Sequence, residues 1–153
     1  MDSGRVFGRV AFTHLHRVEQ TEIVAEFADF LLRMERITWA FCTAYRDDRL
    51  VVSLRSSSTT ARCGQVLRKL IGKSGAAGGH NHMAAGFIDM KQWKPETRET
   101  KRRELVQGLL RAVETRTNRR TAATHPPLEP QPLVAQSAVD SKSSPAGSGD
   151  ANA

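Results

Sequence analysis

The alternation of hydrophobic and polar residues along the chain predicts a small α/β domain. Residues 5–13 alternate with a period of two, which indicates a half-buried strand. Residues 20–35 place apolar side chains three and four positions apart, which indicates an amphipathic helix with one face on a sheet. Residues 37–45 and 50–55 flank the polar turn 46–49 and are rich in strand-forming side chains, so they predict a hairpin.

The second half of the chain continues the alternation of helices and strands. Residues 60–71 have one apolar helix face and end at Gly72, a residue typical of helix C-termini. A short strand is predicted over 84–90, and Pro95 opens a final helix, where its missing N–H costs nothing. The predicted order is β-α-β-β-α-β-α, which indicates a small mixed β-sheet with helices packed on it.

Composition divides the 153 residues into one domain and a tail. We expect the folded domain to span 5–116, which is long enough for a real core. The segment 117–153 holds five of the six prolines together with many Ser and Ala residues. Such a segment buries too little apolar area to offset its ordering entropy, so it is predicted to be a disordered C-terminal tail.

The chain shows no sequence signature of secretion, of a membrane or of bound zinc. It has no apolar run of signal-peptide type or of membrane-spanning length, so we expect a cytoplasmic protein without membrane contact. Cys42 and Cys63 lack the spacing of a metal site or a disulfide framework. Cys42 lies in an apolar strand pattern and is expected to be a buried small hydrophobe.

The net charge of +7 is concentrated in one segment. Residues 91–120 carry ten basic and four acidic side chains. A basic patch of this kind is typical of a polyanion-binding surface, and Trp93 within it is suited to stack on a base. The alternative is a solvated helix face in which Trp93 covers the sheet edge, and basic surfaces without such a function are common.

A stretch of small residues is the strongest candidate for a binding site. Residues 75–86 contain four glycines, four alanines and two histidines, with no acidic side chain. Glycine lets the backbone approach a ligand closely, and the histidines add donors for an anionic oxygen. The stretch follows a strand that ends in Ser53-Leu54-Arg55-Ser56. We therefore expect a loop that binds a phosphate-bearing ligand; the alternative is a flexible connector.

Three motifs in this order resemble a known family. The chain resembles the C-terminal substrate-binding domain of the DHH-family phosphoesterases, which is called the DHH-associated domain. The resemblance rests on Ser53-Leu54-Arg55-Ser56, a helix after it, Gly78-Gly79-His80 and Ala84-Ala85-Gly86-Phe87. That family includes single-strand exonucleases, nanoRNases and cyclic-dinucleotide phosphodiesterases. The resemblance covers roughly residues 7–90, the size of one small domain.

The resemblance implies a substrate-binding role for particular residues. It assigns Arg55 and the segment Gly78, Gly79, His80 to gripping the substrate's phosphate or terminal nucleotide. The spacing to Ala84 leaves His82 as an alternative to His80. The implied partners are a nucleotide or a short single-stranded nucleic acid, together with a DHH catalytic domain.

The family's catalytic half is not encoded in this sequence. Its Asp-His-His motif is absent, and the aspartates are scattered over helix, turn, strand and tail. A two-metal centre needs carboxylates clustered around cations about 4 Å apart. We therefore expect no cofactor in this chain, manganese only in the missing catalytic domain, and no activity in the isolated chain, whether it is a fragment, a separate gene product or a remnant.

Two further hypotheses remain open at this point. The pairs His14-Leu15-His16 and His80-Asn81-His82 would supply four metal ligands to a stand-alone metal-dependent phosphoesterase if they converged. Alternatively, the chain is a decayed structural remnant. Ala76 and Ala77 support this second hypothesis, because they replace part of the family's glycine run.

Overall fold

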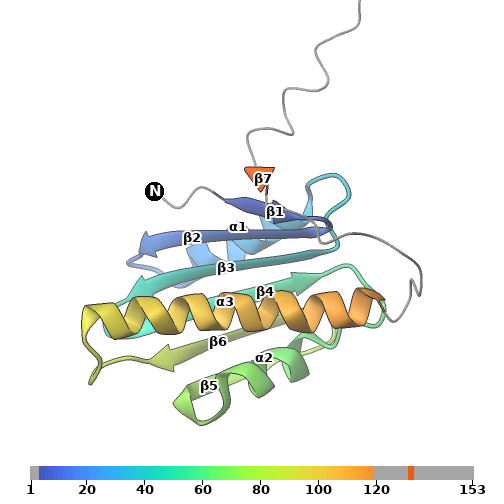
Figure 1. Cartoon of the computed structure of the whole chain (residues 1–153). Coiled ribbons are helices and arrows are strands. Elements are labelled where there is room, and N and C mark those ends of the chain that lie inside the picture. The colour runs from blue at the N-terminus through green and yellow to red at the C-terminus, as the bar shows by residue number, and fades with distance from the viewer. Residues whose placement is uncertain (1–3, 119–130, 133–153) are drawn as a thin grey trace, which may run out of the picture.

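The computed structural model describes residues 4–118 and 131–132, and it confirms the predicted α/β class (Figure 1). The helices are α1 (Glu22–Leu32), α2 (Cys63–Ile71), the short 3₁₀ turn η1 (Gly72–Ser74) and α3 (Pro95–Asn118). The strands are β1 (Arg5–Phe7), β2 (Val10–Arg17), β3 (Trp39–Arg46), β4 (Arg49–Ser56), β5 (Gly75–Gly79), β6 (Met83–Asp89) and β7 (Gln131–Pro132).

The strands form one mixed sheet in the order β5-β6-β4-β3-β2-β1-β7. Among the strands that the structure describes, only β2 and β3 pair in parallel, because the crossover through α1 returns the chain to the same end of the sheet. The remaining pairs are antiparallel. The hairpin predicted over 37–55 is confirmed as β3 and β4, which pair in register from Trp39–Ser56 to Arg46–Arg49.

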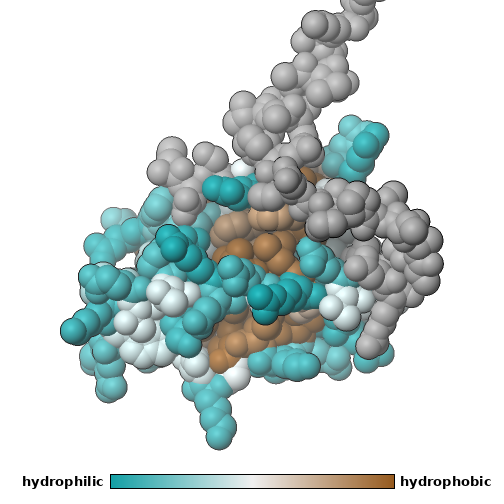
Figure 2. All heavy atoms as spheres, in the orientation of Figure 1, coloured by the Kyte–Doolittle hydropathy of each residue, from teal (hydrophilic) through white to brown (hydrophobic). Residues whose placement is uncertain are grey.

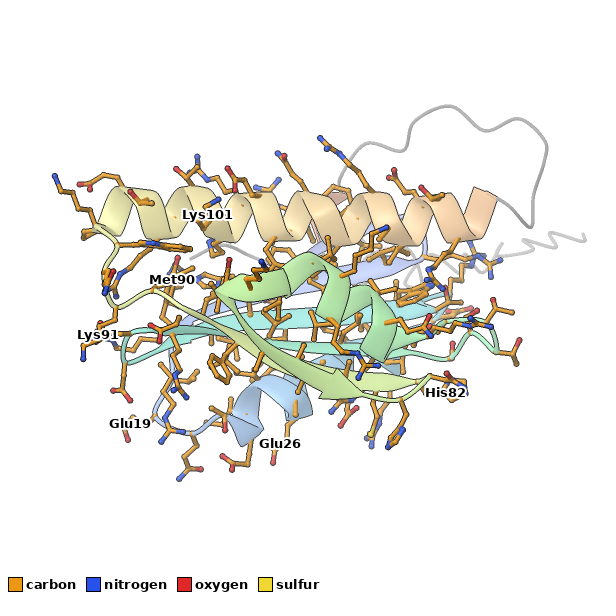
Figure 3. All side chains as sticks on the ribbon, turned by 90° about the horizontal axis from the view of Figure 1, so that it is seen from below. Glu19, Glu26, His82, Met90, Lys91 and Lys101 are labelled. Carbon is orange, nitrogen blue, oxygen red and sulfur yellow. The ribbon has the colours of Figure 1, made fainter. Side chains whose placement is uncertain are left out.

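Helices cover both faces of the sheet, so the domain has three layers (Figure 3). Leu50, Val52 and Leu54 of β4 point to the face covered by α2 and α3, which holds the main core. Figure 2 views this face, where apolar side chains flank the polar outer surface of α3. Cys42 and Ala44 of β3 point to the other face and pack under α1.

The N-terminal strand expected over 5–13 is two strands. Gly8 has φ +59° and reverses the chain between β1 and β2. Val6 therefore lies opposite Ala11 and packs on the α1 face, whereas Val10 and Phe12 join the core on the other face. A turn inside the segment changes which residues share a side, and the period-two pattern did not reveal it.

Helix α1 buries a narrower face than the sequence predicts. Val24, Ala28 and Leu31 are buried, but Phe27 and Phe30 are 42% and 64% exposed. The sheet under α1 presents small side chains, so α1 contacts it through a narrow stripe. The outer part of its apolar band faces solvent.

The glycine-rich stretch is the largest departure in secondary structure. Gly75–Gly79 is not a loop but the edge strand β5, antiparallel to β6. Only residues 80–82 form the connection between the two strands. Helix α3 ends at Asn118, two residues past the predicted domain boundary, and the rest of the predicted tail except β7 lies outside the described residues.

Candidate functional site

The turn between β5 and β6 is held in place by backbone hydrogen bonds to two other elements. The N–H groups of Cys63 and Gly64, at the start of α2, donate to the carbonyls of Asn81 and His80 at 3.0 and 2.9 Å. The N–H of Ser56, at the end of β4, donates to the carbonyl of His82 at 2.9 Å. The turn therefore satisfies the first donors of α2 and lies beside the end of β4.

This arrangement brings together the residues that the sequence assigned to binding. Arg55 pairs in register with Met83 at the start of β6, and Gly78 and Gly79 end β5 at the same turn. His80 and His82 are both exposed in the turn itself. The five candidate residues thus meet at one end of the sheet, although they come from two separate segments of chain.

Arg55 is positioned by contacts that hold most of its guanidinium inside the protein. Its side chain is 10% exposed, and its Nε donates to Asp29 Oδ1 at 2.7 Å. Its Nη1 donates to the carbonyls of Leu54 and Ala84 at 3.1 and 3.4 Å. The sequence did not identify Asp29 as a partner of Arg55, because the two residues are 26 positions apart.

The two histidines of the turn are held differently. His82 Nδ1 lies 3.0 Å from the carbonyl oxygen of Ser56. A carbonyl oxygen only accepts, so Nδ1 carries the proton and the neutral ring keeps Nε2 as an acceptor. The backbone N–H of His80 donates to the carbonyl of Met83 at 2.8 Å, so this donor is used within the turn.

The two glycines before His80 have different structural reasons. Gly79 has φ +147°, and a Cβ there would lie 2.3 Å from the carbonyl oxygen of Met83, so the fold itself requires glycine. At Gly78 a Cβ would meet nothing within 4 Å. The described fold therefore gives no reason for glycine at position 78, where the open space lies above an exposed part of the sheet.

An open groove of about 890 Å³ extends from Gly78 along β5 and β6. Its floor belongs to the α1 face of the sheet, because Val51 in it packs with α1 and Phe87 lies opposite Val51 on β6. Arg55 is on the same face of β4, four residues beyond Val51, at the turn end of the sheet. The far end is formed by residues from the β3–β4 turn and the end of β6: Arg46, Asp47, Asp48, Arg49, Asp89 and Lys91.

Arg62 stands out beside the turn and was not identified from the sequence. It is exposed, occupies the left-handed region at φ +52°, and its carbonyl accepts the N–H groups of Gln65 and Val66. This conformation costs a non-glycine residue about 1–3 kcal/mol. Neither hydrophobic periodicity nor a motif marks such a position, and only its backbone angles do.

The two histidine pairs do not converge. His14 lies in the middle of β2, opposite Thr43 of β3, whereas His82 lies in the β5–β6 turn, and β3 and β4 separate β2 from β6 in the sheet. In Figure 3, His82 and Lys91 mark the two ends of β6. His14 is buried, and its Nδ1 lies 2.8 Å from Thr43 Oγ1. The four-ligand hypothesis is therefore wrong, and within residues 4–118 and 131–132 no group of three or more His, Cys, Asp or Glu side chains is arranged to hold a metal ion.

Several basic side chains of helix α3 form ion pairs with carboxylates of the domain itself. Arg102 is buried and donates to both carboxylate oxygens of Glu99, which also accepts from Tyr45 Oη at 3.4 Å. Arg98 pairs with Asp48 at 3.0 Å and Lys101 with Glu104 at 2.9 Å. Trp93 is half-buried against the main core. The positive charge left for a polyanion is smaller than the count predicts.

The structure confirms the expectation that Cys42 is a buried small side chain. Cys42 and Cys63 are fully buried, and burial raises the pKa of their thiols to about 12 and about 11. Both are therefore inert small hydrophobes at neutral pH. Among the described residues, no helix is both long enough and apolar enough to span a bilayer.

Comparisons with known proteins give a partial answer. No family model matches the chain. An uncharacterized protein of Methanocaldococcus jannaschii is 29% identical over 107 residues, which are 70% of this chain but only 22% of that protein. The chain thus spans about a fifth of the curated relative that it matches.

The solved structures that are similar to this chain at low sequence identity include the following three. The C-Ala domain of Aquifex aeolicus alanyl-tRNA synthetase covers 67% of this chain and 96% of its own, with 20% identity and a TM-score of 0.46. The match to an exopolyphosphatase-related protein from Bacteroides fragilis covers 65% of this chain and 29% of that protein, with 16% identity and a TM-score of 0.43. The match to a pGpG-specific phosphodiesterase from Vibrio cholerae covers 71% of this chain and 35% of that protein, with 13% identity and a TM-score of 0.43.

Proposed function

We propose that this chain is the substrate-binding domain of a DHH-family phosphoesterase. It holds the terminal phosphate or nucleotide of its substrate at the β5–β6 turn, and a separate catalytic domain hydrolyses that substrate. The single observation that supports this most is the meeting of Arg55, Gly78, Gly79, His80 and His82 at one end of the sheet. The motifs that suggested the family are thus spatial neighbours, although the middle of the sequence separates them.

The chemistry of the turn supports an anionic ligand. Arg55 provides a fixed positive charge that Asp29 and two carbonyls keep in one orientation. The exposed side chain of His80 adds a hydrogen-bond donor, and His82 adds one at Nε2 only in the form that carries a proton on both ring nitrogens. The manganese that the family implies does not fit this chain, because no cluster of carboxylates and histidines occurs among its described residues. The proposed role of the chain is therefore recognition of the substrate, and no chemical step is assigned to its residues.

The first test is binding of adenosine 3′,5′-bisphosphate to the full chain at low salt, measured by calorimetry. We expect His80→Ala, His82→Ala and Arg55→Lys each to weaken binding. Substitution of a residue that contacts the phosphate should raise the dissociation constant about tenfold or more, because a hydrogen bond to a charged group contributes about 1.5–3 kcal/mol. Arg111→Lys, the same exchange at an exposed arginine on α3, is the matched control for Arg55→Lys and should change little. Failure of the wild-type chain to bind, or equal binding by all these variants, contradicts the proposal.

Asp29 offers a test in the opposite direction. Its carboxylate is 51% exposed and competes with a bound phosphate for the guanidinium of Arg55. We expect Asp29→Asn to tighten binding of the same bisphosphate several-fold, because the neutral amide keeps the shape but removes the competing charge. Weaker binding by a folded Asp29→Asn protein indicates instead that the ion pair is needed to position Arg55.

A further inference from the structure

The groove beside the turn has a floor almost without side chains. Ala76, Gly78 and Ala85 are exposed on the α1 face of β5 and β6. At Gly78 the space above the backbone is empty for at least 4 Å around the position of a Cβ. Such a floor is flat and lets a planar group lie close to the strands.

A flat cationic and aromatic pair stands at the end of this floor. The Cζ atom of Arg49 lies 4.1 Å from the centroid of the Phe87 ring. Phe87 is half-buried in β6, whereas Arg49 is exposed at the start of β4. Aromatic rings and guanidinium planes are the groups on which unpaired bases stack, with little dependence on sequence.

The charges around the pair suit a base better than a phosphate. Three cations and three carboxylates line this part of the groove: Arg46, Arg49, Lys91, Asp47, Asp48 and Asp89. Two of the carboxylates have partners within the protein, since Asp48 accepts from Arg98 and Asp89 accepts the N–H of Lys91. A phosphate favours a net positive pocket, whereas the edge of a base presents donors and acceptors together.

The spacing along β6 separates this pair from the phosphate end. Met83 lies opposite Arg55, and Phe87 is four residues farther along the same strand. At about 3.3 Å per residue, the pair lies roughly 13 Å from the turn end of the strand. A second nucleotide of a chain that follows the groove is therefore the natural occupant of the Arg49–Phe87 pair.

We propose that the groove takes a single-stranded oligonucleotide of two or more nucleotides, and that Arg49 and Phe87 stack the base of a second nucleotide. The terminal phosphate sits at the β5–β6 turn, and the strand runs over Gly78 and Ala85 toward Lys91. This inference rests on the proposed function and adds a preference for length. A mononucleotide occupies only the turn and gains nothing from the pair.

The experiment compares affinities of the full chain for adenosine 5′-monophosphate and for 5′-phosphorylated adenosine dinucleotide and trinucleotide RNA. We expect the dinucleotide to bind about tenfold more tightly than the monophosphate, in line with the contribution of one stacked base. Arg49→Lys keeps the charge but removes the guanidinium plane, and Phe87→Leu keeps an apolar side chain without the ring. Both should abolish the gain from length and leave the monophosphate affinity unchanged.

Two further measurements separate the possible outcomes. A dinucleotide with 2-aminopurine as its second base should lose fluorescence on binding to the wild-type chain, and this loss should disappear with Phe87→Leu. Gly78→Val, which puts a side chain into the open space, should weaken binding of the dinucleotide. Equal affinity for one and two nucleotides, or a gain that survives in the folded Arg49→Lys and Phe87→Leu proteins, overturns this inference only. No binding of any of the three ligands overturns the proposed function and the inference together.

Discussion

At the scale of single residues, the two adjacent glycines before His80 separate folding from binding. Gly79 adopts φ +147° and touches β6 so closely that any Cβ collides with the backbone at Met83 and Ala84. Gly78 faces empty space and has no such constraint. The same motif thus contains one glycine that the fold needs and one that it leaves available for a ligand.

These two positions make a matched pair for measurement. We expect Gly79→Ala to lower the free energy of unfolding by at least about 2 kcal/mol, because both the backbone angle and the contact disfavour a side chain. Gly78→Ala should change it by no more than about 0.5 kcal/mol. Chemical denaturation of the two variants tests this, and equal losses contradict the assignment of the two glycines.

At the scale of elements, α3 is attached to the sheet by polar as well as apolar contacts. Leu105, Leu109 and Val113 are buried in the main core. Beside them, Glu99 binds the buried Arg102 and accepts from Tyr45 of β3. The hydrogen bond from Arg102 is the largest cause that lowers the pKa of Glu99, from 4.5 to about 2.

This lowered pKa predicts a particular acid sensitivity. Because the folded-state pKa lies below the unfolded one, the contribution of Glu99 to stability is complete above about pH 5 and is lost as pH falls from 4.5 toward 2. Glu99→Gln should lower stability at neutral pH. It should also reduce the slope of unfolding free energy against pH in that window, by an amount that corresponds to the uptake of up to one proton on unfolding. Glu104→Gln, which removes a surface ion pair, is the control. Identical slopes for Glu99→Gln and wild type contradict the prediction.

The element scale also shows where sequence reasoning reached its limit. Helix α2 was predictable because Val66, Leu67 and Ile71 repeat at helical spacing and all three are buried. Strand β5 was not, because Gly75–Gly79 has no β-branched or aromatic residue and takes its form from pairing with β6. The stretch looked like a loop because its partner strand, not its own composition, makes it a strand.

At the scale of the whole molecule, the sequence predicted the layers better than the contacts between them. The three helices, the mixed sheet and the β3–β4 hairpin followed from periodicity, whereas the division of β1 from β2 and the strand β5 did not. The motif residues lie at one end of the sheet. The partners that shape the candidate site were not predictable: Asp29 on Arg55, Arg49 on Phe87 and the backbone of Arg62. Each depends on a distant contact or on a dihedral angle, and neither leaves a periodic trace in the sequence.

The hydrogen bonds from α2 to the β5–β6 turn link ligand binding at the turn to the hydrogen-exchange rates of amides in α2. The amide protons of Cys63 and Gly64 are held by the carbonyls of the turn itself, and the amide of Ser56 is held by His82. Hydrogen exchange at these three amides requires the turn to open. A ligand that steadies the turn should slow their exchange, while the amide of Leu109 in α3 keeps its rate. Exchange rates therefore make the first turn of α2 a reporter of occupancy in the neighbouring site.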